Sequence, residues 1–283
     1  MKILENHEMK LHSNMKVGGI AKRFITVEDK SELKEIFENN SNIFLIGNGT
    51  NTLIDEGNLN ITFVSLKKMD NIRELERGLV EVEAGLDFNK LIAYMNKNNY
   101  SGLENLAGIP GSVGGLVYMN GGAYGSEIFD CISEIEIFDE NHVIRRIKKE
   151  DLDFSYRRTE IQSKKWIIIS AVFKFKDGFD LQKVIEIQAL RESKQPLDLP
   201  NLGSTFKNPA GDFSARLISE AGLKGTVIGG AQISEKHPNF IVNRGTATFE
   251  DISEILKLVK NTISEKYGIN LEEEIIIIKN SDK

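Results

Sequence analysis

The residues Gly108-Ile109-Pro110-Gly111-Ser112-Val113-Gly114-Gly115, followed closely by Asn120-Gly121-Gly122-Ala123-Tyr124-Gly125, are the most informative stretch of the chain. Seven of the 24 glycines in the 283 residues fall between positions 108 and 125. Glycine loses more backbone entropy on folding than any other residue, so such a density needs a reason. The usual reason is a close approach of the backbone to a ligand, with N–H groups turned toward an anion.

A second glycine-containing loop, Gly47-Asn48-Gly49-Thr50-Asn51, follows the apolar run Ile43–Ile46. Phosphate-binding loops often follow a strand in this way. The loop lacks the third glycine of the dinucleotide fingerprint, and the chain has no Walker A sequence. Alone, the loop fits a tight turn better than a phosphate site. Together with Gly108–Gly115, it predicts a large diphosphate-bearing cofactor held between two lobes.

Composition excludes several classes of function. Hydrophobic residues make up 40% of the chain, charged residues make up 28%, and the net charge is −6. A general nucleic-acid surface needs an excess of basic residues, which is missing. No apolar run reaches the roughly 20 residues of a membrane span, and the first residues lack the apolar core of a signal peptide. Cys131 is the only cysteine, and no histidines stand at a metal-ligand spacing. We therefore expect no disulfide, no metal and a cytoplasmic location.

Short β-like runs and amphipathic helices alternate along the chain, which predicts an α+β fold. We divide it into a first lobe (1–66), a second lobe (67–188) and a C-terminal α+β domain (189–283), whose last strand can return to the lobes. The predicted strands are Phe24–Val27, Ile43–Ile46, Ile61–Leu66, Leu79–Ala84, Ile132–Phe138, Val143–Ile147, Trp166–Phe175, Val227–Ile233, Phe240–Val242 and Ile275–Ile278. The predicted helices are one capped by Ser31, one capped by Asp87, Leu181 to about Arg191, Ala215–Ala221, and one with a stripe from Ile252 to Ile263 that begins near Thr248 or Asp251 and ends at Gly268.

The segment Gly203-Ser204-Thr205-Phe206-Lys207-Asn208-Pro209 places a hydroxyl, an ammonium and an amide between turn-forming residues. Compact polar groups of this kind are typical of ligand sites, although the same residues also make an ordinary loop. The nucleophile motif Gly-x-Ser-x-Gly is absent. Proton donation therefore suits Ser204 better than acylation.

Charged residues supply the other candidates. Of the adjacent Arg157 and Arg158, one can hold a carboxylate or neutralise an enolate, although paired arginines are more often surface charges. Glu274, the last residue of Glu272–Glu274, precedes the apolar run Ile275–Ile278, and a carboxylate at the edge of a buried strand suits acid–base chemistry. The first two glutamates fit a solvated cluster. Five basic residues in or near the C-terminal domain indicate either a local anion site or a solvated face. They are Lys194, Lys207, Arg216, Lys224 and Lys236.

In their order and spacing, these segments resemble the UDP-N-acetylenolpyruvoylglucosamine reductases, flavoenzymes of bacterial peptidoglycan precursor synthesis, over nearly the whole chain. The short interval between Arg157 and Trp166 is similar to the shorter class of this family, which lacks an inserted tyrosine-bearing loop. The segments that carry the resemblance are Asn14–Gly19, Gly47–Asn51, Gly108–Gly115 with Tyr118-Met119-Asn120, Gly122–Gly125, Tyr156-Arg157, Ser193–Pro196, Gly203–Pro209 and Ala221–Gly225.

The resemblance implies a fold of the vanillyl-alcohol-oxidase type, with non-covalent FAD between the first two lobes and a third domain closing over a UDP-sugar. It also implies that NADPH reduces FAD, and that the enolpyruvyl ether of UDP-N-acetylglucosamine then takes the hydride on its vinyl carbon. Ser204 would donate the proton, while Arg157 and Glu274 would polarise the carboxylate.

The same resemblance implies the binding residues. Those expected for FAD are Gly47, Asn48, Gly49, Thr50, Asn51, Gly111, Ser112, Gly114, Gly115 and Tyr124. Those expected for the substrate are Lys194, Lys207, Asn208 and Arg216. We expect a monomer that acts on small molecules, with no metal, nucleic acid or membrane insertion.

Departures from the family pattern leave alternatives open. Gly121 stands where alanine is common, and Leu202 where a smaller residue is common. Ile276 stands where a basic residue often follows the catalytic glutamate by two, so a slip of one residue would give that role to Glu273. Another FAD-dependent sugar or hydroxy-acid oxidase of this fold, or a non-catalytic nucleotide-sugar-binding protein, is the alternative. Several such oxidases tether FAD through a histidine, and this chain has no histidine close to either glycine loop in the sequence.

Overall fold

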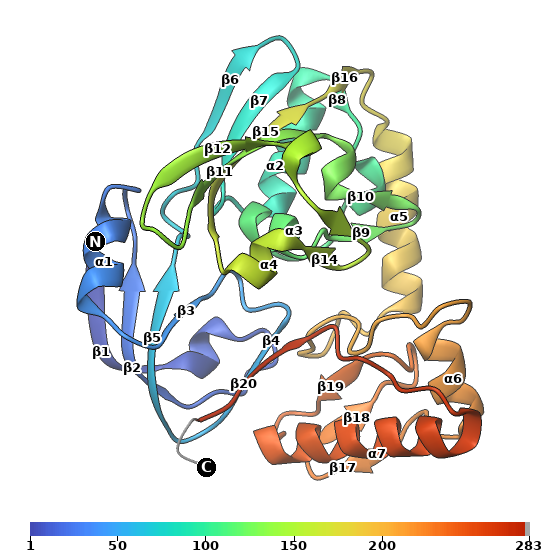
Figure 1. Cartoon of the computed structure of the whole chain (residues 1–283). Helices are drawn as coiled ribbons and strands as arrows, with labels where there is room; N and C mark the ends of the chain where they lie inside the picture. Colours follow the sequence, from blue (N-terminus) through green and yellow to red (C-terminus); the bar gives the residue numbers. More distant parts are fainter. Residues whose placement is uncertain (281–283) are drawn as a thin grey trace. The chain divides into compact units, whose positions relative to one another are not determined.

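The computed structural model describes residues 1–280 and mixes short strands with helices, so the predicted α+β class is confirmed (Figure 1). The helices are α1 (Glu32–Asn39), α2 (Phe88–Asn98), α3 (Val113–Tyr118), α4 (Glu160–Lys164), α5 (Leu181–Lys194), α6 (Ser214–Glu220) and α7 (Phe249–Tyr267). The strands are β1 (Lys2–Glu8), β2 (Ile20–Thr26), β3 (Ile43–Leu45), β4 (Thr52–Ile54), β5 (Asn58–Ser65), β6 (Ile72–Glu76), β7 (Leu79–Glu83), β8 (Tyr100–Ser101), β9 (Gly122–Ala123), β10 (Ser126–Glu127), β11 (Ile132–Phe138), β12 (Ile144–Lys148), β13 (Phe154–Ser155), β14 (Arg158–Thr159), β15 (Ile167–Lys174), β16 (Lys176–Asp177), β17 (Val227–Ile228), β18 (Ala231–Ile233), β19 (Ile241–Asn243) and β20 (Ile276–Ile278).

The chain forms two compact units. The first comprises Met1–Glu5, Arg23–Asn48 and Ile61–Leu190, and the second comprises Asn6–Lys22, Gly49–Asn60 and the chain from Arg191 onward. In the four-stranded sheet with the order β1-β2-β5-β3, the strands β1, β2 and β5 each contain residues assigned to both units. The three-part division at residues 66 and 188 stays a prediction.

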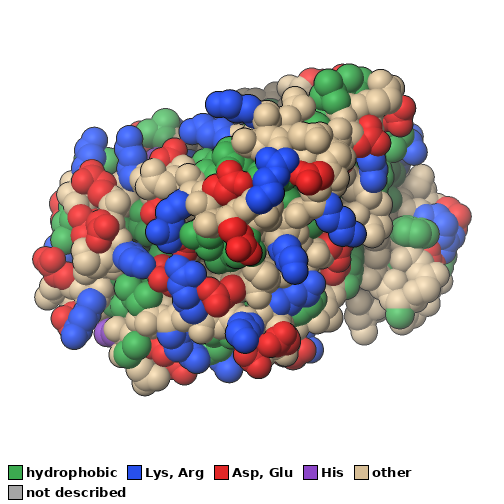
Figure 2. Space-filling model, turned by 90° about the horizontal axis from the view of Figure 1, so that it is seen from above, with side chains coloured by type: hydrophobic (Ala, Val, Ile, Leu, Met, Phe, Trp, Pro, Cys, Tyr) green, Lys and Arg blue, Asp and Glu red, His purple; other side chains and the backbone are tan. Residues whose placement is uncertain are grey.

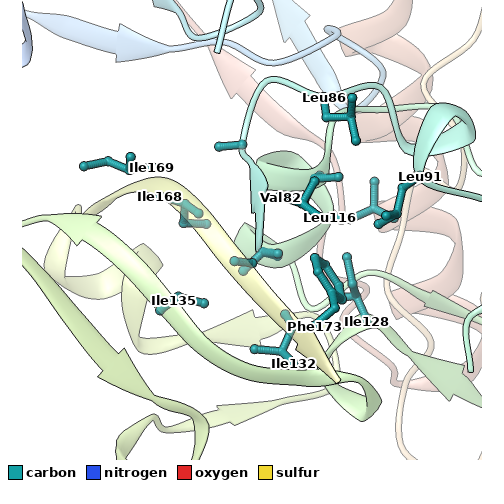
Figure 3. Packing of buried hydrophobic residues seen from close by; sticks show 14 of the residues in the cluster. Val82, Leu86, Leu91, Leu116, Ile128, Ile132, Ile135, Ile168, Ile169 and Phe173 are labelled. Atoms are coloured by element: carbon teal, nitrogen blue, oxygen red, sulfur yellow. The ribbon is translucent and has the colours of Figure 1, made fainter. Parts of the chain in front are cut away.

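The core of the first unit lies on a five-stranded sheet with the order β12-β11-β15-β7-β6. Neighbouring strands of this sheet are antiparallel, and β15 is buried along its whole length except at Lys174. Figure 3 shows Val82 and Phe173 of this sheet with Leu91 of α2 and Leu116 of α3, all of them buried. Asp87 begins α2 by accepting a hydrogen bond from the N–H of Asn89, as the sequence predicts.

Charged side chains on the first unit pair with one another. Lys30 Nζ lies 2.9 Å from Glu136, and Arg146 contacts both Glu81 and Glu134. Figure 2 shows one face of the molecule, on which basic and acidic side chains are interspersed.

The second unit has its own core, built on α7 and the sheet β17-β18-β19. The predicted stripe of α7 is confirmed, because Ile252, Ile255, Leu256, Val259 and Ile263 are buried. Both predicted cap residues take part: the Thr248 side chain accepts from the N–H of Asp251, and the Asp251 side chain accepts from the N–H of Thr248. Such a capping box satisfies two N–H groups that the first turn leaves without partners. Gly268 ends the helix in the left-handed conformation.

Strand β20 pairs in parallel with β4, so that Ile276 stands opposite Thr52 (Figure 1). The backbone N–H of Ile276 donates to the carbonyl of Asn51 at 2.9 Å, which extends the pairing toward the second glycine loop. Strand β20 therefore pairs with the residues that directly follow the loop Gly47–Asn51.

Two local predictions were wrong, and several short elements were missed. Ser31 does not cap α1, because it is itself helical and its hydroxyl donates to Asp29 at 2.5 Å. The strand predicted over Val227–Ile233 is interrupted at Gly229-Gly230. The backbone of these glycines turns toward Asp251, and Asp251 leaves no room for a side chain on Gly229. The short helices α3 and α4 and the strands β1, β4, β6, β8, β9, β10, β13, β14 and β16 were not predicted.

Candidate active site

Gly47 and Asn48, the part of the second glycine loop that belongs to the first unit, lie against the loop Gly108–Gly115. A Cβ atom built on Gly47 would lie 2.8 Å from Oγ of Ser112, closer than ordinary contacts permit. Asn48 Nδ2 donates to Asp87 Oδ2 at 3.0 Å, and Asp87 forms a β-bridge with Ser112. The structure thus brings Gly47 and Asn48 beside Gly111 and Ser112, as a shared binding site requires.

The N–H groups of the two later glycines already have partners in the chain. Gly114 donates to the carbonyl of Ala84 at 2.8 Å, and Gly115 donates to Oγ of Ser112 at 3.2 Å. A Cβ on Gly114 would lie 2.7 Å from that of Ala84. These glycines therefore allow α3 to pack closely against the chain before α2.

Arg157 is held by the glycine-rich segment that follows α3. It occupies the turn between β13 and β14 with φ of 55°, and its guanidinium is half-buried. Nη2 donates to the carbonyl of Gly122 at 2.7 Å, and Nη1 donates to that of Asn120 at 3.4 Å. The fully buried Asn120 side chain donates in turn to the carbonyl of Ser155 at 3.1 Å and to Glu127 at 2.7 Å. The arginine and the loop containing Tyr124 are therefore one hydrogen-bonded structure.

Ser204 and Glu274 come together within the second unit. Residues 205–207 pair antiparallel with residues 272–274 around a bridge between Phe206 and Glu273. The N–H of Glu274 donates to the carbonyl of Thr205, the residue after Ser204, at 2.8 Å. Asn51 Nδ2 donates to the carbonyl of Glu274 at 3.1 Å. A hydroxyl, a carboxylate and the end of the second glycine loop thus lie on adjacent backbone segments.

The expected substrate residues differ in their surroundings. Lys207 Nζ lies 2.5 Å from Glu272, and Asn208 Oδ1 accepts the N–H of Ser214 at the start of α6. Lys194 is exposed at the end of α5. Arg216 hydrogen-bonds to Asp212, just before its helix α6, and to Glu220 at the end of that helix. These bonds raise the pKa of its guanidinium, and the bond to Arg216 lowers the pKa of Asp212 to about 2. Arg216 would have to leave both carboxylates to reach a substrate.

Two buried asparagines, Asn201 and Asn239, were not predicted as site residues. Asn239 bonds to the backbone of Phe206. Asn201 accepts the N–H of Gly203 at its side chain, and its carbonyl accepts the side-chain amide of the half-buried Asn14. Asparagine beside proline or glycine in the sequence indicates only a turn. The signal that distinguishes them is burial, which the sequence does not contain.

A cavity of about 510 Å³ lies elsewhere in the second unit. Ser204, Lys207, Asn208 and Glu274 do not line it. Its charged lining has three carboxylates against one ammonium, which disfavours an anionic ligand. We therefore do not assign the substrate to it. The lining residues are Glu192, Pro196, Leu197, Asp198, Leu199, Gln232, Ser234, Glu235, Lys236 and Val242.

Residues 1–280 have neither a membrane-spanning helix nor a cluster of metal-ligating side chains. No helix among them is long and apolar enough to cross a membrane. No group of three histidine, cysteine, aspartate or glutamate side chains in this range is arranged to hold a metal ion.

Comparison with known proteins identifies the family. One family model, described as an FAD binding domain, matches residues 21–148. Another, described as the C-terminal domain of UDP-N-acetylenolpyruvoylglucosamine reductase, matches residues 195–278. The chain is 59% identical to the UDP-N-acetylenolpyruvoylglucosamine reductase of Fusobacterium nucleatum subsp. nucleatum, over 99% of this chain and 100% of that protein. The chain belongs to the UDP-N-acetylenolpyruvoylglucosamine reductase family.

More distant reductases agree. The chain is 37% identical to the reductase of Caldanaerobacter subterraneus subsp. tengcongensis, over 98% of this chain and 94% of that one. The crystal structure of UDP-N-acetylenolpyruvylglucosamine reductase from Thermus caldophilus superposes with a TM-score of 0.84 at 30% identity, covering 98% of each chain. The resemblance inferred from the motifs is confirmed, and so is an FAD-binding module followed by a C-terminal domain.

The second glycine loop lies within the range that matches the FAD binding domain. Gly49 has φ of 64°, and a Cβ on it would lie 1.8 Å from the carbonyl oxygen of His12. No other residue type fits such a position. The glycine thus lets the loop pack against the backbone at His12, and the assignment of this loop to FAD stays a prediction.

Proposed function

We propose that this reductase uses NADPH and FAD to reduce the enolpyruvyl ether of UDP-N-acetylglucosamine to UDP-N-acetylmuramate, a peptidoglycan precursor. The observation that carries the proposal is the antiparallel pairing of residues 205–207 with 272–274. It supports the proposal because Ser204 directly precedes one paired segment and Glu274 is the last residue of the other. We propose that the protein acts in the cytoplasm as a monomer.

The reaction balances with one added proton. The residues assigned to the cofactor would hold FAD, which would supply a hydride obtained from NADPH for the terminal vinyl carbon, and that carbon would become a methyl group. The electron pair of the C=C bond then lies on the carbon next to the carboxylate. Ser204 breaks its O–H bond to give that carbon a proton and recovers one from solvent. A serine hydroxyl is a weak acid, so it protonates only a strongly basic carbon.

We assign stabilisation of the negative charge to Arg157 and Glu274. The carbonyls of Asn120 and Gly122 fix the direction of the Arg157 guanidinium, so little reorganisation is needed when charge develops. Glu274 contributes if it shares a proton with the substrate carboxylate. Its backbone is fixed on both sides, by Thr205 and by Asn51.

For cofactor binding, we assign the diphosphate to the backbone N–H groups of Gly47–Asn51. Gly114 and Gly115 support the site by packing, because their N–H groups bond to Ala84 and Ser112. Gly111, Ser112 and Tyr124 complete the proposed cofactor residues. Of the substrate residues, we assign Lys194, Lys207 and Asn208 to the anionic and amide groups of the UDP-sugar, and Arg216 to an outer position.

Rapid mixing of the Ser204→Ala variant tests the proposal. Flavin reduction by NADPH should match the wild type, whereas reoxidation by the enolpyruvyl UDP-sugar should slow by at least about 100-fold, because general acid catalysis contributes that much. Ser133→Ala is the matched control, since that hydroxyl bonds to the carbonyl of Val172 in the first unit. Unchanged reoxidation in Ser204→Ala would remove Ser204 from the mechanism.

A further inference from the structure

We propose that Asn239 is a positioning residue for Ser204, an inference that rests on the proposed role of Ser204. Asn239 is 4% exposed and lies in the turn before β19. Its Oδ1 accepts the N–H of Phe206 at 3.0 Å, and its Nδ2 donates to the carbonyl of Phe206 at 2.8 Å. Its own carbonyl accepts the N–H of Thr205 at 2.8 Å. One residue thus binds both residues that follow Ser204.

The side-chain amide of Asn239 hydrogen-bonds to the backbone of Phe206 as a neighbouring strand would. The opposite edge of residues 205–207 is occupied by residues 272–274, through Thr205 and Lys207. Phe206 faces the other way with both its N–H and its C=O, and its side chain is 1% exposed. A side-chain amide offers an acceptor and a donor at the spacing of a backbone partner, whereas an ionised carboxylate offers acceptors alone. The backbone leading from Ser204 is therefore fixed from both sides.

Asn239 is itself held by a compact turn. Ser234 Oγ accepts the N–H groups of Lys236 and His237 at 3.1 and 3.2 Å. The N–H of Phe240 donates to the carbonyl of His237 at 2.9 Å, and the N–H of Ser234 donates to the carbonyl of Phe240 at 2.8 Å. The position of the Asn239 amide is thus set by the turn before any substrate binds.

Such a contact matters because proton transfer depends steeply on distance. A displacement of about 1 Å at a reacting group can cost about 100-fold in rate. Loss of the Asn239 amide frees the Phe206 backbone on one side and lets the Ser204 hydroxyl move. Hydride transfer from NADPH to the cofactor does not use Ser204, so that step should be insensitive to the change.

The substitution Asn239→Asp gives a titratable version of the contact. A protonated carboxyl still donates to the carbonyl of Phe206, whereas the carboxylate repels it. In this variant the rate of flavin reoxidation should rise as pH falls through the pKa of the introduced group. The rate of flavin reduction should follow the wild-type pH profile.

The test compares Asn239→Ala, Asn239→Asp and Ser204→Ala in the FAD-loaded enzyme. The matched control is Asn243→Ala, because Asn243 is also 4% exposed and makes three hydrogen bonds to backbone, with Met15, Gly245 and Ala247. Flavin reduction by NADPH and reoxidation by the enolpyruvyl UDP-sugar are measured separately. Amide hydrogen exchange at Phe206 gives a readout that does not depend on catalysis.

We expect Asn239→Ala to slow reoxidation at least about 10-fold, to leave reduction within about 2-fold and to speed exchange at Phe206, with none of these changes in Asn243→Ala. Wild-type reoxidation in Asn239→Ala, with slow reoxidation in Ser204→Ala, would overturn the inference and leave the proposed function standing. Wild-type reoxidation in Ser204→Ala would instead remove the proposed role of Ser204. If Asn239→Ala does not fold, a wild-type pH profile for reoxidation in Asn239→Asp overturns the inference.

Discussion

Lys260 and Glu273 form an ion pair in which Nζ lies 2.8 Å from Oε1. Lys260 belongs to α7, and Glu273 is the residue before Glu274. Because side chains alternate along an extended segment, neighbouring glutamates point to opposite sides. The ion pair therefore directs Glu273 toward α7 and favours Glu274 for the catalytic assignment.

We expect Glu274→Gln to slow flavin reoxidation by about 100-fold, because the amide cannot share a proton with the substrate carboxylate. Glu273→Gln is its control. It breaks a partly exposed ion pair, so it should lower the free energy of unfolding by less than about 1 kcal/mol and leave reoxidation within about 2-fold. Rapid mixing and urea titration of both variants provide the measurement. A slow Glu273→Gln with a normal Glu274→Gln would reverse the assignment.

Arg157→Lys should impair reoxidation strongly. A lysine ammonium is a point charge and cannot reach the carbonyls of both Asn120 and Gly122 in the planar geometry of a guanidinium. We expect a loss of about 10- to 100-fold, on the scale of other lost electrostatic contacts. Arg158→Lys is the neighbouring control, because Arg158 is exposed and lies 3.5 Å from Asp153. Equal effects of the two substitutions in rapid mixing would contradict the assignment.

Gly47→Ala tests the proposed cofactor cradle. Its methyl group would lie 2.8 Å from Oγ of Ser112. FAD affinity, measured by flavin fluorescence, should fall at least about 10-fold in this variant. Removing the clash in the double variant Gly47→Ala/Ser112→Ala should not restore affinity if the glycine is needed for close approach to FAD. Full recovery in the double variant, relative to Ser112→Ala alone, would show that the loop is only a tight turn.

Cys131 predicts a stability change at alkaline pH. Burial raises the pKa of its thiol to about 11 from an ordinary 9.0. Between these values the folded protein keeps a proton that the unfolded chain loses, so the free energy of unfolding falls as pH rises from 9 to 11. The decrease is at most about 2 kcal/mol. Urea titrations at several pH values should show a shallower decrease in Cys131→Ala than in the wild type. Parallel curves would contradict the prediction.

Local patterns predicted the elements that have local causes. The α7 helix has its stripe, its capping box and its final glycine within one segment. Strand β1 is exposed at most positions, so it shows no apolar alternation. Strand β4 has three residues, and its pairing partner β20 lies at the other end of the chain. Such pairing is a tertiary effect that short patterns do not contain.

The site residues also divide into those that the sequence could suggest and those that it could not. Ser204, Arg157 and Glu274 have side chains whose chemistry suggests a role, and the family resemblance supplied the assignment. Asn120 and Asn239 carry no such chemistry and act through backbone groups brought to them by folding. The hydroxyl of Ser112, expected to contact the cofactor, accepts a hydrogen bond from Gly115. The sequence could not distinguish these uses of the same polar groups.

The most direct test of the central claim is the visible absorption of the purified protein under anaerobic conditions. NADPH is added first and the enolpyruvyl UDP-sugar second. We predict a flavin band that bleaches with NADPH and returns only with the sugar. A band that bleaches but does not return with the sugar would contradict the substrate assignment, and a protein that cannot take up flavin would contradict the assignment of both glycine loops.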